Sequence, residues 1–197
     1  MVTAPIKTRR LVLKRQSLND FDRFFDMSKD HDVMKYIGDG SVFHWTRDVA
    51  YKKFNEQVSV PVTEGIGVMA IYRESDSRYL GWCAISHSKF LDDMELGYRL
   101  CRDCWGCGYA TEAASAMLSE AYHATDVNRI MACAHPENTA SIRVLEKLGF
   151  KFAYPIFSNP IQREIPVYRI SRRIYCMGLG MGLGMGLISG PNCRGDF

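Results

Sequence analysis

The stretch Arg102-Asp103-Cys104-Trp105-Gly106-Cys107-Gly108-Tyr109-Ala110-Thr111-Glu112-Ala113 decides the fold, because a strand-like segment enters it and a strongly helical segment leaves it. Glycines let a backbone turn tightly and approach a ligand closely, and the free amides at a helix start point toward negative charge. A Gly-x-Gly at such a junction therefore predicts a cradle for phosphate. Taken alone, the same pattern is equally typical of a plain tight turn.

The length and charge of the chain limit its class. Its 197 residues suffice for one compact domain, and a net charge of +3 is too small to indicate a nucleic-acid-binding protein. The N-terminus has no signal-peptide pattern, and no run reaches the roughly 18 apolar residues that a membrane span needs. We therefore expect a cytoplasmic protein without a membrane or nucleic-acid partner.

The seven cysteines are scattered through expected strands and the glycine loop, which favours reduced thiols over a disulfide framework. Cys101, Cys104 and Cys107 form a C-x2-C-x2-C pattern that is also found in cluster-binding ferredoxins. The expected fourth ligand is missing, because Thr111 stands four residues after Cys107. A metal or cluster protein remains an alternative, although no other spacing of His, Asp or Glu indicates a catalytic metal.

The hydrophobic pattern predicts an α/β domain with a mixed sheet. Strands are expected over 6–15, 67–72, 79–87, 94–100, 129–134, 150–155 and 167–175, and helices begin near 17, 33, 46, 110 and 138. Ala113, Met117 and Ala121 belong to an apolar stripe on the helix that follows the glycine loop, so this helix must pack on the sheet. Residues 1–175 are therefore expected to form the domain. Residues 176–197, with their repeated Met-Gly-Leu-Gly units, form a low-complexity tail that we expect to be disordered.

A second motif, His135-Pro136-Glu137-Asn138-Thr139-Ala140-Ser141-Ile142-Arg143-Val144-Leu145-Glu146-Lys147-Leu148-Gly149-Phe150, lies downstream. Together with 8–14, 95–98 and 105–113, it resembles the GNAT superfamily of acyl-CoA-dependent N-acetyltransferases. The most similar branch acetylates N-terminal residues, alanine or serine, of ribosomal proteins. The resemblance covers about residues 6 to 175 and is specific for the superfamily, but it leaves the acceptor open.

This resemblance implies a single GNAT-like domain with a central sheet of about six to seven strands, a V-shaped splay between two parallel strands, and about four flanking helices. It also implies that acetyl-CoA is the cofactor. The resemblance and the glycine loop together give the following candidates for cofactor binding: Leu96, Gly97, Tyr98, Leu100, Arg102, Cys104, Trp105, Gly106, Cys107, Gly108, Tyr109, Ala110, Thr111, Asn138, Ser141, Arg143 and Lys147. Several of these have a plainer interpretation. Asn138 suits a helix N-cap, and Arg143 and Lys147 suit a solvated basic face.

Two residues are candidates for catalysis. Glu95 is predicted to be the general base, acting through water, because it sits just before the expected splay; a solvent-facing strand residue is the alternative. Ser141 is predicted to donate a proton to the departing thiolate, although it could also be an ordinary first-turn serine. Leu145 departs from the superfamily pattern, in which a tyrosine often stands at this position and protonates the thiolate.

The acceptor is an amine, and its pocket is expected between 38–45 and 157–166, with Phe43, His44 and Trp45 as an aromatic wall. An α-amino group, with a pKa near 8, needs less base assistance than a lysine does. The resemblance to the ribosomal-protein branch implies a protein or peptide N-terminus as the acceptor, with direct transfer and no acyl-enzyme. The alternatives are a small-molecule amine (a polyamine, an aminoglycoside or an amino acid), or a non-catalytic acyl-CoA-binding module. The chain is expected to be a monomer or a homodimer.

Overall fold

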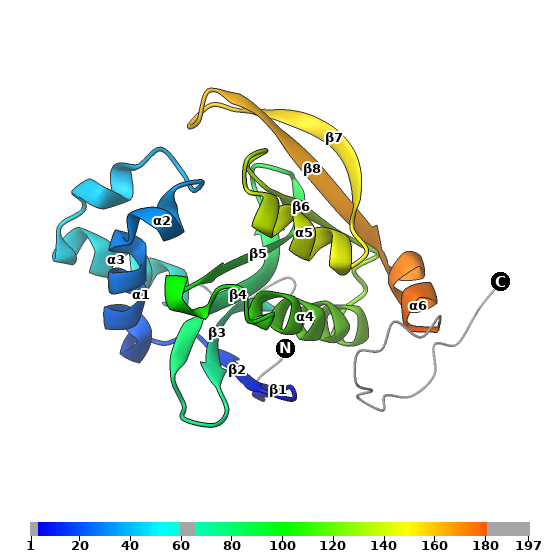
Figure 1. The fold of residues 1–197 in the computed structure, drawn as a ribbon, viewed down its shortest axis with the longest axis horizontal. Coiled ribbons are helices and arrows are strands. Elements are labelled where there is room, and N and C mark those ends of the chain that lie inside the picture. The colour runs from blue at the N-terminus through cyan, green and yellow to red at the C-terminus, as the bar shows by residue number, and fades with distance from the viewer. Residues whose placement is uncertain (1–3, 60–65, 181–197) are drawn as a thin grey trace.

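The computed structural model describes residues 4–59 and 66–180, in which eight strands form one sheet in the order β1-β2-β3-β4-β5-β6-β8-β7 (Figure 1). The strands are β1 (Ile6–Lys7), β2 (Leu11–Arg15), β3 (Gly67–Arg73), β4 (Tyr79–Ser88), β5 (Asp93–Leu100), β6 (Arg129–Cys133), β7 (Lys151–Ser158) and β8 (Arg163–Ser171). Only β5 and β6 are parallel; all other neighbours are antiparallel. The predicted α/β fold with a mixed sheet is confirmed.

The sheet has one strand more than the six to seven expected, because the first expected strand, 6–15, is a hairpin. The amide of Thr8 donates to the carbonyl of Leu11 at 2.9 Å, and the Leu11 amide donates to Thr8 Oγ1 at 2.9 Å. The chain therefore reverses, and Ile6 pairs with Leu13. This turn contains no glycine or proline, so no turn residue predicts it.

The described residues contain six α-helices, against about four expected. They are α1 (Phe21–Lys29), α2 (His31–Met34), α3 (Arg47–Ser59), α4 (Tyr109–Ala124), α5 (Thr139–Lys147) and α6 (Arg172–Gly180), with 3-10 turns η1 (Leu18–Asp20), η2 (Ser41–His44) and η3 (Arg102–Cys104). Figure 1 shows α4 and α5 together in front of the strands and α1, α2 and α3 gathered at one side. None of these helices is long and apolar enough to cross a membrane.

Two hydrophobic clusters hold these layers together. The larger one joins the buried face of α4, including Ala113, Met117 and Ala121, to the sheet, as the apolar stripe predicted. The second gathers α1, α2, η2 and α3 around Phe54, and Trp82 of β4 packs against it from the sheet. The two faces of the central strands therefore contact different sets of helices.

The predicted splay lies between β5 and β6. Their only register pair is Glu95 with Met131, yet β5 continues to Leu100 and β6 to Cys133. The two parallel strands therefore separate after Glu95. The backbone of β5 beyond that point has β4 on one side and no strand on the other.

The C-terminal part differs from expectation. The last strand was expected over 167–175, but β8 ends at Ser171 and α6 begins at Arg172. The Arg172 guanidinium donates to the carbonyls of Tyr122, Thr125 and Val127, which ties the start of α6 to the end of α4 and the following loop. This long-range contact has no sequence signal. The tail was predicted to begin at residue 176, but α6 continues to Gly180, and the part beyond residue 180 lies outside the described residues.

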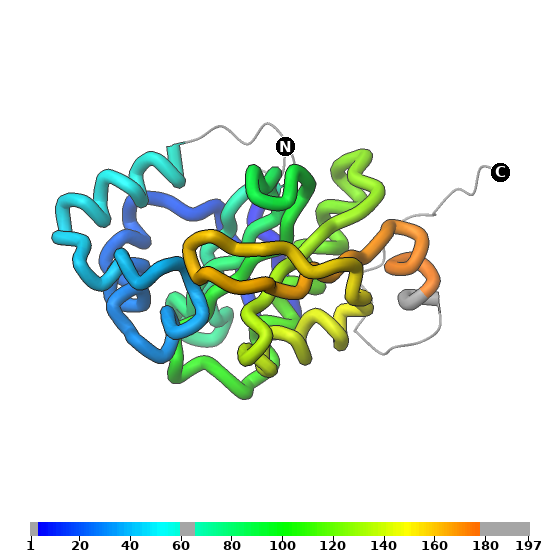
Figure 2. The backbone as a smooth tube through the Cα atoms, turned by 90° about the horizontal axis from the view of Figure 1, so that it is seen from above, coloured from blue at the N-terminus to red at the C-terminus, as the bar shows by residue number. Residues whose placement is uncertain are grey.

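The hairpin formed by β7 and β8 extends away from the main layers. Figure 2 shows it crossing over the molecule from the α6 end toward the α2 region. At its tip, Pro160 and Ile161 line the same groove as Gly38 and Phe43. The two segments expected to frame the acceptor pocket are therefore neighbours.

Candidate functional site

The predicted cradle is a turn with two left-handed residues. Gly106 has φ +74° and Gly108 has φ +77°, a region that costs about 1–2 kcal/mol for a residue with a side chain. A Cβ at Gly106 would meet no atom within 4 Å, so the requirement for glycine comes from the backbone angle and not from crowding. The loop is open on this side.

The first turn of α4 leaves amide donors at this cradle. The helical hydrogen bonds begin with the Glu112 amide donating to the Gly108 carbonyl at 3.1 Å, and no side chain caps the helix start. The amides of Tyr109, Ala110 and Thr111 come before this first bond, so they donate to no carbonyl of the helix. Backbone donors at a helix start, combined with the helix dipole, favour an anion.

An N-terminal contact that the sequence reasoning missed fixes this helix start. Glu112 accepts hydrogen bonds from Thr8 Oγ1 at 2.6 Å, from the Arg10 amide at 2.9 Å and from Arg10 Nε at 2.7 Å. Burial opposes ionisation of Glu112, but these bonds from Thr8 and Arg10 outweigh it and hold its pKa below the ordinary value. The Arg10 guanidinium also lies 4.6 Å from the centre of the Tyr109 ring, which brings a cation next to the cradle.

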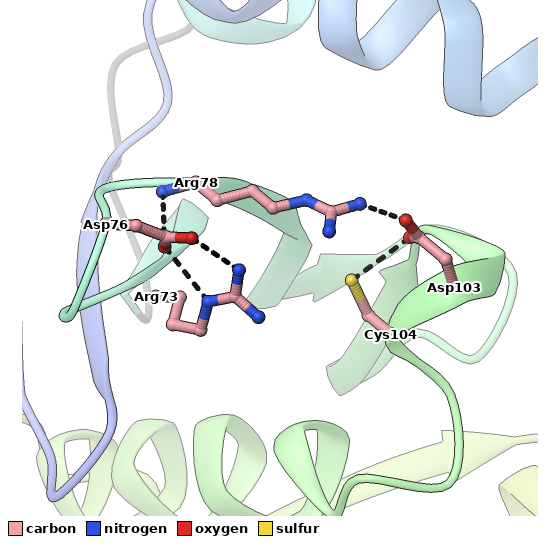
Figure 3. Close-up of polar contacts among 5 residues, drawn as sticks. All are labelled: Arg73, Asp76, Arg78, Asp103 and Cys104. Atoms are coloured by element: carbon pink, nitrogen blue, oxygen red, sulfur yellow. Dashed lines mark hydrogen bonds and ion pairs between the residues drawn. The ribbon is translucent and has the colours of Figure 1, made fainter.

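The other end of the cradle is tied to the turn between β3 and β4 (Figure 3). Asp103 forms an ion pair with Arg78 and accepts a hydrogen bond from Cys104 Sγ, and the bond from Arg78 lowers the pKa of Asp103. In the same turn, the hydrogen bond from Arg73 lowers the pKa of Asp76 to about 2. The acidic residue in the cradle is therefore directed toward Arg78.

The cysteines and the tryptophan of the loop point in different directions. Cys104 is buried, Cys101 is half-buried and Cys107 is exposed. Burial is the main cause that raises the pKa of Cys104 to about 12, and the neighbouring Asp103 is the second cause. Within residues 4–59 and 66–180, no group of three or more His, Cys, Asp or Glu side chains is placed to hold a metal ion. The indole of Trp105 donates to the Leu100 carbonyl at 3.0 Å, so it caps the end of β5.

The register of β5 identifies which amides face the splay. The Cys101 amide donates to the Leu80 carbonyl at 2.8 Å, so the odd-numbered residues of β5 pair with β4. The backbone groups of Leu96, Tyr98 and Leu100 therefore point to the β6 side. Since Leu96 lies next to the single pair with Met131, the Tyr98 amide is the first one inside the opening.

Tyr98 and Ser141 meet across this opening. The Tyr98 hydroxyl donates to the Ser141 carbonyl at 3.1 Å and lies 3.0 Å from Ser141 Oγ. Burial raises the pKa of Tyr98 to about 12, so the phenol is protonated at neutral pH. Asn138 is the N-cap of α5, because its Oδ1 accepts from the Ser141 amide at 3.1 Å. The cap interpretation is thus confirmed, and it places Ser141 beside β5.

Glu95 lies at the base of the splay and is half-buried. The thiol of Cys133 donates to Glu95 Oε1 at 3.1 Å. Burial is the main cause that raises the pKa of Cys133, and the Glu95 carboxylate is the second cause. The thiol is therefore a donor that orients Glu95. Sequence reasoning missed Cys133, although it ends the strand before the second motif.

The remaining candidates on α5 differ in how exposed their side chains are. Arg143 and Lys147 are exposed, as expected for a helix face in contact with solvent. Leu145 is fully buried in the larger cluster, so the position where the superfamily often has tyrosine is part of the core in this chain.

The expected acceptor side has a groove of about 560 Å³. Its lining residues come from α2, the following loop and the β7–β8 tip: His31, Asp32, Met34, Lys35, Ile37, Gly38, Asp39, Gly40, Phe43, Pro160 and Ile161. Phe43 stacks on His31 with ring centres 4.0 Å apart, whereas Trp45 packs into the second cluster and His44 is exposed. Of the three expected wall residues, only Phe43 lines the groove.

Two further residues organise this side. Lys29 Nζ donates to the carbonyls of Val42, Phe43 and Trp45 at 3.0, 3.1 and 2.8 Å, which fixes the η2 turn. His135 stacks on Tyr36 at 4.9 Å and lies 3.0 Å from Arg163 of β8. His135 therefore links the loop before α5 to both borders of the groove.

Comparisons with known proteins agree with this arrangement. A family model described as an acetyltransferase (GNAT) domain matches residues 10–151. YnaD of Bacillus subtilis, described as an uncharacterized N-acetyltransferase, is 32% identical over 151 residues, which cover 74% of this chain and 82% of YnaD.

Two solved structures share the fold. An acetyltransferase (GNAT family) from Bacillus anthracis has a TM-score of 0.73 at 24% identity and covers 86% of this chain and 99% of its own. RimL, a ribosomal L7/L12 alpha-N-protein acetyltransferase in complex with coenzyme A, has a TM-score of 0.73 at 12% identity and covers 85% of this chain and 98% of its own.

Proposed function

The chain belongs to the GNAT acetyltransferase family, whose members transfer an acetyl group from acetyl-CoA to an amine, and we propose that its acceptor is the α-amine of a protein or peptide N-terminus. The observation that supports acetyl transfer to an amine is the splay itself, where the Tyr98 amide has no strand partner among the described residues and Glu95 lies at the base. These two groups supply a hydrogen-bond donor and a base, which are needed by an amine that attacks a carbonyl.

The residues present fit the cofactor. The uncapped amides of Tyr109, Ala110 and Thr111, with the open backbone at Gly106, would hold the diphosphate. Tyr98 and Ser141 would line the path of the thiol arm. When bound, acetyl-CoA supplies an acetyl group activated as a thioester.

In the proposed mechanism, Glu95 accepts the proton of the attacking amine, directly or through one water. The Tyr98 amide donates to the oxygen on which negative charge develops, and Ser141 Oγ donates to the departing sulfur. A thiol with a pKa near 8.5 needs little assistance to leave, so the apolar residue at Leu145 is compatible with turnover. We propose direct transfer, because burial raises the pKa values of Cys101, Cys104 and Cys133 and so disfavours these three thiols as nucleophiles.

The α-amine of a peptide has a lower pKa than a lysine side chain and needs less assistance from a base. A single carboxylate, Glu95, is therefore better suited to a peptide N-terminus. RimL, which shares the fold, is described as acting on the α-amine of a ribosomal protein. A small-molecule amine is the second candidate, and the compact groove between α2 and the β7–β8 tip favours it.

The experiment is free-thiol release from acetyl-CoA with two matched panels of acceptors, N-terminal peptides and small amines, each also followed by mass spectrometry of the product. We expect faster release with peptides and acetylation of their α-amine. A higher kcat/KM for small amines than for peptides would reject the peptide N-terminus as the acceptor and favour a small-molecule amine. Acetyl-CoA binding without turnover on either panel would indicate a non-catalytic module.

A further inference from the structure

The face of β5 that contacts Trp82 carries charges of opposite sign at its two ends. Glu95, Gly97 and Arg99 alternate on this face, while Tyr98 points to the opposite one. Alternate residues of a strand are about 6.6 Å apart, so the Glu95 and Arg99 backbones are separated by about 13 Å. The same surface therefore has a carboxylate at the base of the splay and a guanidinium four residues further along β5.

Arg99 differs from the other half-buried arginines of the described chain. Arg10 and Arg73 pair with carboxylates, and Arg172 donates to three backbone carbonyls. Arg99 pairs with no carboxylate within residues 4–59 and 66–180, and its Nε is fully enclosed without a hydrogen-bond partner among them. Burial lowers the pKa of Arg99 to about 10, so the group is still a cation at neutral pH.

Trp82 forms the floor of this arrangement. It is the cross-strand partner of Arg99, its ring centre lies 5.3 Å from the guanidinium carbon, and its Nε1 is also enclosed without a partner. A Cβ at Gly97 would lie 3.6 Å from the same indole, so glycine adds no side-chain atom of its own between Glu95 and Arg99. A buried donor without an acceptor is destabilising, and two such donors of the described residues lie on cross-strand neighbours here.

We propose that Arg99 is a specificity residue that binds a carboxylate of the acceptor while the amine of the same molecule faces Glu95. This inference rests on the proposed acetyl transfer and narrows its acceptor to an amine that also carries a carboxylate. A carboxylate satisfies a guanidinium with two parallel hydrogen bonds, which a carboxamide or an ammonium cannot do.

Two sources supply this chemistry. One is an N-terminal peptide with an acidic side chain at its second or third residue, about 7–10 Å from the amine in an extended chain. The other is the α-carboxylate of a free amino acid or dipeptide. The carboxylate is the shared requirement, and the acceptor panel distinguishes the two.

The test compares acceptors that differ only in one charge. The first pair is a tetrapeptide amide with Glu at position 2 or 3 and the same peptide with Gln. The second pair is a dipeptide as its free acid and as its amide. For the wild-type enzyme, kcat/KM should be at least tenfold higher for the acid member of one pair, and that pair identifies the source.

The variants are Arg99→Gln and Arg99→Lys, with Arg173→Gln, an exposed arginine on α6, as control. Arg99→Gln should remove the acid preference by raising KM for the acid member, Arg99→Lys should retain part of it, and acetyl-CoA affinity should stay within twofold. If Arg99 had only a structural role, its substitution would lower kcat/KM by the same factor for both members of a pair.

Equal wild-type rates for acid and amide acceptors would overturn the inference, and so would an unchanged preference in Arg99→Gln. If neither panel is acetylated, the proposed function fails, and calorimetric binding of the Glu and Gln peptides then tests Arg99 separately. Equal affinities in that measurement would also reject it. Should Arg99→Gln fail to fold by circular dichroism, the wild-type acid-to-amide ratio and Arg99→Lys still decide.

Discussion

The two sides of the splay are built in different ways. The cradle side consists of main-chain donors around Gly106 and Gly108, and its charged side chains satisfy one another, as Glu112 does with Thr8 and Arg10. The acceptor side is a groove lined by residues of α2, η2, the loop between them and the β7–β8 tip. On the strands β4 and β5, Trp82 and Arg99 each have an enclosed donor without a partner among the described residues.

This difference separates the shared chemistry from the specificity. A diphosphate needs a fixed set of amides, which one local turn can supply whatever its side chains are. An acceptor has to be recognised by its own charges and shape, so the groups that contact it come from several elements and differ between relatives. Substitutions on the two sides should therefore change different kinetic constants.

Glu95→Gln should give the largest effect. Loss of a positioned base lowers kcat by about 10² or more, whereas acetyl-CoA affinity should change less than twofold because the carboxylate is distant from the cradle. Steady-state kinetics with calorimetry of acetyl-CoA binding measures both. Asp92→Asn, in the exposed turn before β5, is the matched control, and an unchanged kcat across pH would remove Glu95 from the mechanism.

Glu112→Gln should lower the free energy of unfolding by about 2 kcal/mol at pH 7, because charged hydrogen bonds from Thr8 and Arg10 are weakened. The pKa of Glu112 is lowered by folding, so its contribution is complete above the ordinary value of 4.5 and decreases as the pH falls through the folded-state value.

Denaturant midpoints at pH 7 and pH 4 measure this change. The difference between wild type and Glu112→Gln should shrink at the lower pH. Glu137→Gln, which removes an exposed pair with Arg163, should cost less than about 0.5 kcal/mol at both pH values. Equal costs for the two variants would contradict the role of Glu112 in fixing the start of α4.

Gly106→Ala should weaken acetyl-CoA binding about tenfold, because alanine strains or shifts a left-handed residue of the cradle. Gly38 is the matched control: its φ is +64°, it also has no atom within 4 Å of a Cβ, and it lies on the acceptor side. Gly38→Ala should leave the acetyl-CoA Kd unchanged in the same titration. Similar Kd values for the two variants would mean that the cradle backbone does not hold the cofactor.

Asp32→Asn should give the smallest effect. It breaks the exposed ion pair between Asp32 of α2 and Arg102 of η3, which are 2.5 Å apart and join the two sides. Such pairs contribute about 0–1 kcal/mol, so Tm should fall by no more than a few degrees. A larger loss, or an altered acetyl-CoA Kd, would show that the acceptor side and the cradle are coupled through this contact.

Local features of the fold were predictable from the sequence. The glycine loop, the apolar stripe of α4 and the Asn138 cap each depend on residues within one or two turns of each other, and the structure places them as expected. The predicted strand 6–15 was wrong because its turn lacks glycine and proline. The strand predicted over 167–175 was wrong because Arg172 finds its carbonyl partners more than forty residues away.

The sequence by itself determined that a glycine loop joins a strand to a helix, and it indicated an acetyl-transferring family. This was possible because backbone angles and helix starts depend on neighbouring residues. Only the tertiary structure decided that Glu112 pairs with Arg10, that Tyr98 meets Ser141, and that Arg99 finds no carboxylate among the described residues. These pairings depend on strand register and on which face a side chain occupies, and residues far apart in the chain set both.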